Sequence, residues 1–152
     1  MPLSALDVMT IHHCGERRDF KLQKGGYYFD GKHISISIET WAEDQESPYS
    51  ALFSLVNYPI DTETLSEGSQ FTFSDNHATG WDDENTHANA YFDFHAQSVQ
   101  LTIKILAIHS DALTVQLSAL MEDYGYDDDG RQLNPMIGTF RLPSKSKSEL
   151  WI

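Results

Sequence analysis

The feature of this sequence that most restricts its fold is a strict alternation of apolar and polar residues in three segments. Successive side chains of a β-strand point to opposite faces, so a period of two predicts strands with one face in a core and the other in water. Half-buried strands of this kind are typical of antiparallel sheets. We therefore expect the polar partners, Ser35 and Ser37 among them, to face solvent. The segments and their apolar residues are "HISISIETW" (33–41) with Ile34, Ile36 and Ile38, "SVQLTIKIL" (98–106) with Val99, Leu101, Ile103 and Ile105, and "ALTVQLSALM" (112–121) with Leu113, Val115, Leu117, Ala119 and Met121.

Turn signals and shorter β-like segments occupy most of the remaining sequence. Asp30-Gly31 predicts a two-residue hairpin connection because this pair tolerates positive φ angles, and "HSDA" (109–112) predicts a second tight turn. Gly25 and Gly26 precede aromatic residues and predict a turn that leads into a strand. The shorter candidate strands are 18–22, 26–29, 53–58, 69–74, 90–96 and 136–142, with further turns at 66–69 and 127–135.

These segments together predict an all-β fold. We expect an antiparallel β-sandwich or a partly open barrel of about eight short strands, with little helix. The 152 residues are enough to bury a core, and no linker divides them, so we predict a single β-rich domain over 1–152. The polar stretch "SKSKS" lies in 143–152, which we predict to be a flexible C-terminal tail.

Cysteine content and the N-terminal sequence bear on the compartment. One cysteine, Cys14, cannot form an internal disulfide, which is typical of a reducing environment. Residues 1–18 lack the basic start and long apolar run of a signal peptide, and all apolar stretches are of strand length. We therefore expect a cytoplasmic protein that does not associate with membranes.

The charge of the chain is strongly negative and unevenly distributed. A net charge of −13 disfavours binding to nucleic acids and anionic membranes and favours a basic partner. No Lys or Arg lies between Lys32 and Lys104, and a second acidic cluster follows at Glu122, Asp123 and 127–129. The acids of the stretch without Lys or Arg are Glu39, Glu43, Asp44, Glu46, Asp61, Glu63, Glu67, Asp75, Asp82, Asp83, Glu84 and Asp93.

The segment "YGYDDDGRQLN" (124–134) has part of the composition of a calcium loop. The EF-hand spacing is not met, since position 125 is Gly and position 136 is Met, and the flanking segments are predicted strands. A hairpin connection closed by Asp129-Gly130 fits these flanks better.

The polar segment 75–95 contains three histidines, His77, His87 and His95, beside several carboxylates. Such side chains can bind zinc or iron, and on a predicted strand Tyr91, Asp93 and His95 share one face. The segment has no H-x-H or H-E-x-x-H spacing, so a solvated loop with hydrogen-bonded histidines is the alternative. "HHC" (12–14) is interpreted as structural, because neighbouring side chains of an extended chain point to opposite faces.

A predicted loop of sixteen residues, 75–90, has Trp81 beside Asp82, Asp83 and Glu84. Long loops in compact domains are often functional, and an aromatic residue surrounded by carboxylates is typical of an anchor for a basic partner. The alternative is that Trp81 folds back and covers the core.

The function that these observations favour is binding of a basic protein. The chain has no nucleophile elbow, P-loop, dinucleotide fingerprint or zincin helix, and we expect neither enzymatic activity nor a cofactor. In composition it resembles the immunity proteins that bacteria make against nuclease toxins, which implies occlusion of a toxin's active surface. A carbohydrate-binding sandwich and a metal-dependent enzyme using the 75–95 histidines are the alternatives. The predicted partner-binding residues are Trp81, Asp82, Asp83, Glu84, Tyr124, Tyr126, Asp127, Asp128 and Asp129.

Overall fold

The nine strands of the computed structural model belong to one antiparallel sheet. The structure describes residues 6–13, 16–42, 52–60, 65–74, 87–91, 95–123 and 133–150. Within these ranges the short 3-10 turn η3 (Lys147–Glu149) is the only helix, and no helix is long and apolar enough to cross a membrane. The predicted antiparallel all-β fold is confirmed. The strands are β1 (Val8–His13), β2 (Glu16–Phe29), β3 (His33–Ala42), β4 (Leu52–Pro59), β5 (Gln70–Ser74), β6 (His87–Tyr91), β7 (His95–Ile108), β8 (Ala112–Asp123) and β9 (Leu133–Pro143).

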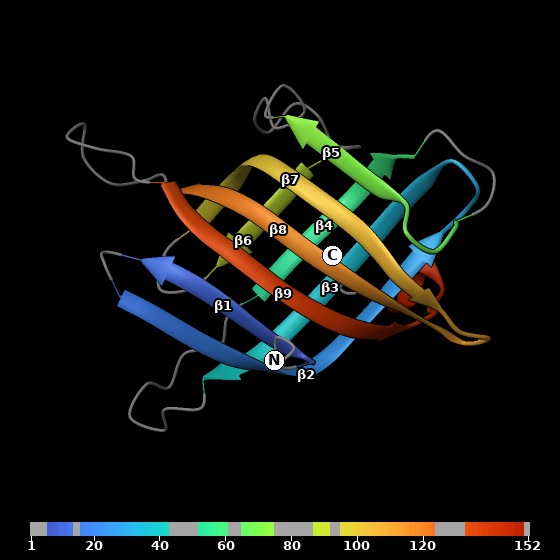
Figure 1. Ribbon diagram of the computed structural model, residues 1–152, viewed down its shortest axis with the longest axis horizontal. Coiled ribbons are helices and arrows are strands. Elements are labelled where there is room, and N and C mark those ends of the chain that lie inside the picture. Colours follow the sequence, from blue (N-terminus) through green and yellow to red (C-terminus); the bar gives the residue numbers. More distant parts are fainter. Residues whose placement is uncertain are drawn as a thin grey trace.

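The sheet curls strongly into a half-barrel. Its strands follow the order β5-β7-β6-β4-β3-β2-β1-β9-β8, and β7 also pairs with β8, so the curled sheet meets itself at these two strands. In Figure 1, β1, β9, β8 and β7 cross in front of β2, β3 and β4. The core lies inside the curled sheet. The side chains on the other face of each strand point outward.

The three alternating segments form β3, β7 and β8, and their predicted inward residues face the core, except Val99, whose side chain lies outside the described ones. Ile34, Ile36 and Ile38 have no exposed surface, and Ala119 is the most exposed of the inward residues on β8 at 5%. This burial removes large aliphatic side chains from water and is the main source of the sheet's stability. The remaining core residues include Met9, Ile11, Phe20, Phe53, Leu55, Leu101, Ile103, Ile105, Met136, Phe140 and Leu142.

The prediction of two strands at 18–22 and 26–29 is wrong, because β2 runs unbroken from Glu16 to Phe29. Gly25 and Gly26 lie inside this strand and leave space on its two faces. A Cβ on Gly25 would lie 2.8 Å from Cδ2 of the buried Leu142, and one on Gly26 would lie 2.6 Å from Cγ of Lys145. The glycines therefore serve close packing rather than a turn.

A further strand, β1, was not predicted. In "VMTIHH" the adjacent Val8 and Met9 obscure the alternation, although Met9 and Ile11 are both buried against the core. The strand β1 pairs with β2 on one side and β9 on the other, and so joins the two ends of the chain.

The single strand predicted at 90–96 is two strands. Residue Tyr91 ends β6 and pairs with His95, the first residue of β7, so the chain reverses direction between them. The predicted strand that carried Tyr91, Asp93 and His95 on one face is therefore wrong. Because β6 begins at His87, the predicted loop 75–90 is also too long, and the connection between β5 and β6 is 75–86.

Two predicted turns are confirmed, each with three residues rather than two. Residues 30–32 connect β2 to β3, with a positive φ of 92° at Gly31 and a bond from Asp30 N to His33 O. Residues 109–111 connect β7 to β8, with a bond of 2.9 Å from His109 N to Ala112 O. Strands β8 and β9 also pair as the predicted hairpin requires, although its connecting residues lie outside the described ranges.

Ser35 and Ser37 were predicted to face water, but each is only 1% exposed. They do point away from the core, as their alternation with the buried isoleucines requires. Gly26, the register partner of Ser37, lies under the side chains of Lys145 and Leu150, so the C-terminal segment covers this part of the outer face. This segment belongs to the predicted flexible tail, whose flexibility stays a prediction.

Candidate functional site

One end of the half-barrel collects the ends of most strands. Successive pairings connect Ala42 of β3 with Phe20 of β2, Leu52 of β4 with Tyr91 of β6, and His95 of β7 with Tyr91. The pairings of Ala96 with Asp123 and of Glu122 with Leu133 continue the same line across β7, β8 and β9. We call this the acidic end and define it by Ala42, Leu52, Tyr91, His95, Asp123 and Leu133.

The acidic end is where three acid-bearing segments leave and rejoin the described strands. These segments, 43–51, 92–94 and 124–132, connect β3 to β4, β6 to β7 and β8 to β9. Antiparallel hairpins return to the end of the sheet from which they leave, so segments far apart in sequence share one attachment line. Their acids are Glu43, Asp44, Glu46, Asp93, Asp127, Asp128 and Asp129, with Glu122 and Asp123 at the end of β8.

The connection 75–86 is attached close by but not at this end. Strands β5 and β6 both pair with the same side of β7, at residues 100–104 and 95–97 respectively. The last residue of β5, Ser74, is opposite Gln100 of β7. The segment that carries Trp81 therefore starts beside the middle of β7.

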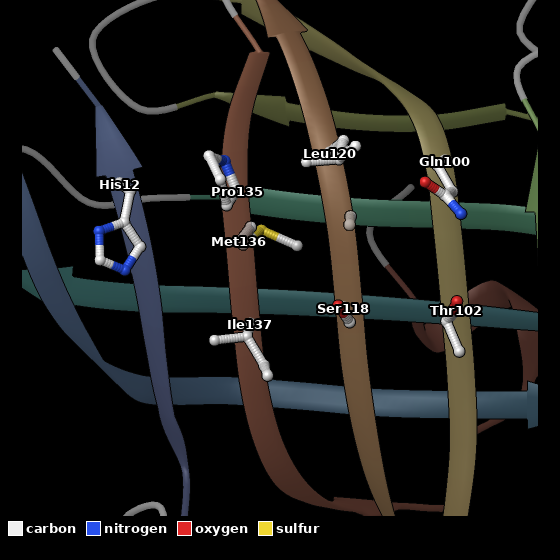
Figure 2. A pocket seen from close by; sticks show the side chains of 9 residues that line it. His12, Gln100, Thr102, Ser118, Leu120, Pro135, Met136 and Ile137 are labelled. Atoms are coloured by element: carbon white, nitrogen blue, oxygen red, sulfur yellow. The ribbon is translucent and has the colours of Figure 1, made fainter. Parts of the chain in front are cut away.

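A shallow depression lies on the outer face between these attachment points. Its volume is about 340 Å³, and it spans four neighbouring strands, β1, β9, β8 and β7. Figure 2 shows His12 on one side and Gln100 and Thr102 on the other, with β9 and β8 between them. We call it the outer depression, and its lining is His12, Gln100, Thr102, Ser118, Ala119, Leu120, Pro135, Met136 and Ile137.

The lining of the outer depression combines apolar and hydrogen-bonding groups. Ile137 is 44% exposed, and Leu120 is opposite Pro135 in the pairing of β8 with β9. The side chains of Gln100 and Ser118 are exposed. Thr102 bonds to Thr72 of β5 at 3.2 Å. A surface of this kind suits contact with a protein segment.

A polar cluster lies on β1 and β2 at the side of His12. Thr10 donates to Oδ1 of Asp19 at 2.6 Å, and Arg17 donates to the same oxygen at 3.3 Å. The hydrogen bond from Thr10, with a smaller contribution from the Arg17 guanidinium, lowers the pKa of Asp19. Arg17, the register partner of His12, is therefore already paired with a carboxylate.

Sequence reasoning missed the outer depression. A signal was present, because Leu120 and Ile137 are apolar at positions where the alternation of β8 and β9 calls for polar, outward residues. Three of the strands that line the depression, β7, β8 and β9, follow one another along the chain, but the pairing of β9 with the unpredicted β1 joins its two ends and was not readable from the sequence.

The nine predicted partner-binding residues lie outside the described ranges. The strand residues to which their two segments are attached lie near the outer depression. Ser74, which precedes the first segment, is opposite Gln100 in the lining of the depression. Glu122 and Leu133, close to the ends of the second segment, pair with each other two positions beyond the lining pair Leu120 and Pro135. The residues concerned are Trp81, Asp82, Asp83, Glu84, Tyr124, Tyr126, Asp127, Asp128 and Asp129.

The basic residues of the strands are concentrated on β2 and β9, and two of them, Arg17 and Arg18, lie beyond Phe20 at the acidic end. Strands β3, β4 and β6 lie side by side and contain no Lys or Arg, whereas β2 and β9 lie on either side of β1. The basic ends of the sequence thus meet on one part of the sheet. The cations of β2 and β9 are Arg17, Arg18, Lys21, Lys24 and Arg141.

The alternative sites receive no support from the described residues. No group of three His, Cys, Asp or Glu side chains among them is arranged to hold a metal ion. His77 lies outside these ranges, as do the side chains of His87 and His95. Among the described residues that line the outer depression there is no Trp, Tyr or Phe on which a sugar ring would stack.

Comparison with known proteins gives no relationship from which a role could be transferred. No family model, no curated protein and no solved structure matches this chain.

Proposed function

We propose that this protein is a non-enzymatic, acidic binding module of the immunity or antitoxin type. In this proposal it neutralises a basic, nuclease-like toxin by covering the toxin's active or substrate-binding surface. The proposed contacts are made by Trp81, Asp82, Asp83, Glu84, Tyr124, Tyr126, Asp127, Asp128 and Asp129.

The observation that carries the proposal is the shared attachment of the acidic segments. Three of them, 43–51, 92–94 and 124–132, start and finish at the acidic end, although their positions in the sequence are far apart. Acids gathered in one region produce a stronger local potential than the same charges spread evenly, and this potential speeds association with a basic surface.

The apolar residues of the outer depression also support the proposal, because they offer surface that a partner could bury. Charged contacts at a rim give mainly specificity and rate, whereas buried apolar contacts give much of the affinity. Leu120, Pro135 and Ile137 offer such contacts next to the row formed by Glu122 and Leu133. A basic segment would thus have carboxylates for its cations and apolar surface for its side-chain stems.

The test is capture of partners from the native host with immobilised full-length protein. We expect one basic protein to be retained at low salt and released as ionic strength rises, because exposed charge pairs are screened. Toxicity of that protein in cells, relieved by co-expression of this chain, would establish the immunity role. Capture of no basic protein at any salt concentration would contradict the proposal.

A charge-reversal variant gives a second, independent readout. Changing Asp82, Asp83 and Glu84 together to lysine should weaken partner binding by about tenfold or more and leave the melting temperature nearly unchanged. A matched control changes Asp111, an exposed acid of the β7–β8 turn, to lysine. Loss of folding in the triple variant would show that these acids serve structure.

A further inference from the structure

Within the described part of the chain, strand β5 pairs with a neighbour along one edge only. That neighbour is β7, and β5 is the first strand in the order of the sheet. Strand β6 pairs with the same side of β7 at residues 95–97, beyond the end of β5, so it continues the row of β5 instead of flanking it. Figure 1 shows β5, in green, beside β7. We call the side of β5 turned away from β7 the outer edge.

The register determines which backbone groups of β5 point to the outer edge. Ile105 N donates to Ser69 O at 2.8 Å, so alternate residues from Ser69 onward, such as Phe71, exchange bonds with β7. The backbone N–H and C=O groups of Gln70 and Thr72 therefore point away from β7. Such a row of groups is what another extended chain needs to join a sheet.

The margin of the core beside the outer edge is incompletely covered. Phe71 and Phe73 pack against the core, but both are only partly buried. Their register partners on β7, Ile103 and Leu101, have no exposed surface. A strand added to β5 would place every second side chain beside the two rings and remove more of their surface from water. These inward side chains of the occupant are therefore expected to be apolar.

The charge around β5 favours a basic occupant. The strand itself is uncharged and contains no proline or lysine, the residues that commonly block an exposed edge. The segments that adjoin the described range 65–74 contain no Lys or Arg, and Lys104 of β7 lies on the side of β5 opposite to the outer edge. Lysine or arginine on the occupant would complement this charge. The acids of the adjoining segments, 61–64 and 75–86, are Asp61, Glu63, Asp75, Asp82, Asp83 and Glu84.

We infer that the outer edge of β5 is a docking site for an extended segment of a basic protein, in which apolar and basic side chains alternate. The segment joins the sheet as a further strand. Its basic side chains lie on the outer face, where Thr72 bonds to Thr102 in the lining of the outer depression. The inference deepens the proposed function and rests on it, because it specifies the form in which the basic partner binds.

A synthetic peptide of this pattern is the probe. Fluorescein-labelled KVKVKVK is titrated with full-length protein and followed by anisotropy. Because Gln70 and Thr72 face the outer edge, the peptide residues that bond to β5 are those with outward side chains, the lysines. Methylation of the backbone nitrogens of the two inner lysines keeps the charge and should weaken binding about tenfold or more, since main-chain bonds supply much of the affinity. Equal binding of the two peptides would mean that charge alone attracts them, and would overturn the inference.

The variant Thr72→Pro tests the outer edge from the side of the protein. Because the Thr72 N–H points outward, proline removes an edge donor and no bond to β7. We expect KVKVKVK to bind this variant about tenfold more weakly than the unaltered chain. Thr72→Val is the matched control, because it also loses the hydroxyl that bonds to Thr102 but keeps the N–H, and it should retain binding. If both variants bind the peptide equally well, the inference is wrong.

Amide exchange tests the outer edge without any substitution. In the free protein the Thr72 amide should exchange about tenfold faster than the Phe71 amide, since only the latter bonds to β7, and KVKVKVK should remove most of this difference. Equal protection of the two amides in the free protein would show that the outer edge is already occupied. Protection of Thr72 that rises with protein concentration would assign the edge to a second copy of the chain. Either result, or no change on addition of the peptide, would overturn the inference.

Failure of this inference is distinguishable from failure of the proposed function, because the peptide experiments use no protein from the host. Capture of a basic host protein by a chain that does not bind KVKVKVK would place the partner elsewhere on the molecule. Binding of the peptide at the outer edge without capture of any basic host protein would support the docking site and contradict the immunity role.

Discussion

The carboxylate of Asp30 satisfies two backbone donors of the β2–β3 turn. Its Oδ1 accepts from Lys32 N at 2.8 Å and from His33 N at 2.7 Å. The bond from the His33 amide, followed by that from Lys32, lowers the pKa of Asp30 from 3.8. Because the side chain is 40% exposed, we expect Asp30→Ala to reduce the free energy of unfolding by only about 0.5–1 kcal/mol at neutral pH.

The contribution of Asp30 should depend on pH in one direction. A carboxylate whose folded pKa lies below its unfolded pKa stabilises the fold fully above about pH 4, and this contribution is lost as the pH falls through the folded pKa. Urea unfolding at neutral pH and near pH 2 should therefore show a difference between Asp30→Ala and the unaltered chain only at the higher pH. Asp30→Asn, which keeps an acceptor oxygen, is the control and should lose less.

Gly138 of β9 makes room for an aromatic ring. A Cβ at this position would lie 2.5 Å from Cζ of Phe140 and 2.9 Å from the backbone oxygen of Val8. We expect Gly138→Ala to destabilise the fold by about 2–3 kcal/mol, as overpacking does in a dense core. Phe140→Leu should relieve part of this loss, so denaturant unfolding of the double variant should show less than the sum of the two losses. Strict additivity would contradict the assigned contact.

The burial of a residue could be predicted from the sequence where it depends only on the residue's own strand. The burial of Ile34, Ile36 and Ile38 follows from alternation alone. The burial of Ser35 and Ser37 does not, because it depends on a segment more than a hundred residues later in the chain. The carboxylate of Glu149 accepts from Ser146 N and Ser146 Oγ, and the flexibility that the repeated serines and lysines indicate for this segment stays a prediction.

At the scale of elements, Glu67 joins the 65–69 turn to β7. Its Oε2 accepts from the backbone amide of Ile108 at 2.9 Å, at the end of β7 where the register shifts beside Ile105. Since β5 pairs with β7 only up to Lys104, the carboxylate supplies an acceptor where no strand does. Glu67→Ala should lower stability by about 1 kcal/mol and speed exchange of the Ile108 amide, whereas Glu67→Gln should restore most of both. Unchanged exchange at Ile108 would contradict this role.

Element types were easier to predict than element boundaries or neighbours. The long alternating strands were found because each contains enough positions to show the period. β2 was divided because its glycines were interpreted as a turn, and β6 was joined to β7 because three residues of connection do not interrupt a β-like composition. The outer depression also required the adjacency of β1 and β9, which pairs the two ends of the chain and does not follow from the hairpins of β7, β8 and β9.

For the whole molecule, the distribution of charge matters more than its sum. The cation-free strands β3, β4 and β6 adjoin one another, and three acid-bearing connections, 43–51, 92–94 and 124–132, share the acidic end. Like charges brought together by folding repel one another and oppose the folded state, while they attract a basic partner. The same acids should therefore reduce stability and increase partner affinity.

Neutralising the acids of one connection separates these two effects. Changing Asp127, Asp128 and Asp129 together to asparagine replaces the Asp129-Gly130 pair by an Asn-Gly pair, which suits a hairpin turn equally, and removes three negative charges. We expect the melting temperature to rise by about 1–2 °C and partner binding to weaken by about tenfold. The matched variant neutralises Asp61, Glu63 and Asp111, whose described neighbours lie at the other end of the strands. It should raise the melting temperature similarly while binding is retained. Equal weakening by both variants would mean that only net charge matters, and a lower melting temperature for the first would assign its aspartates to structure.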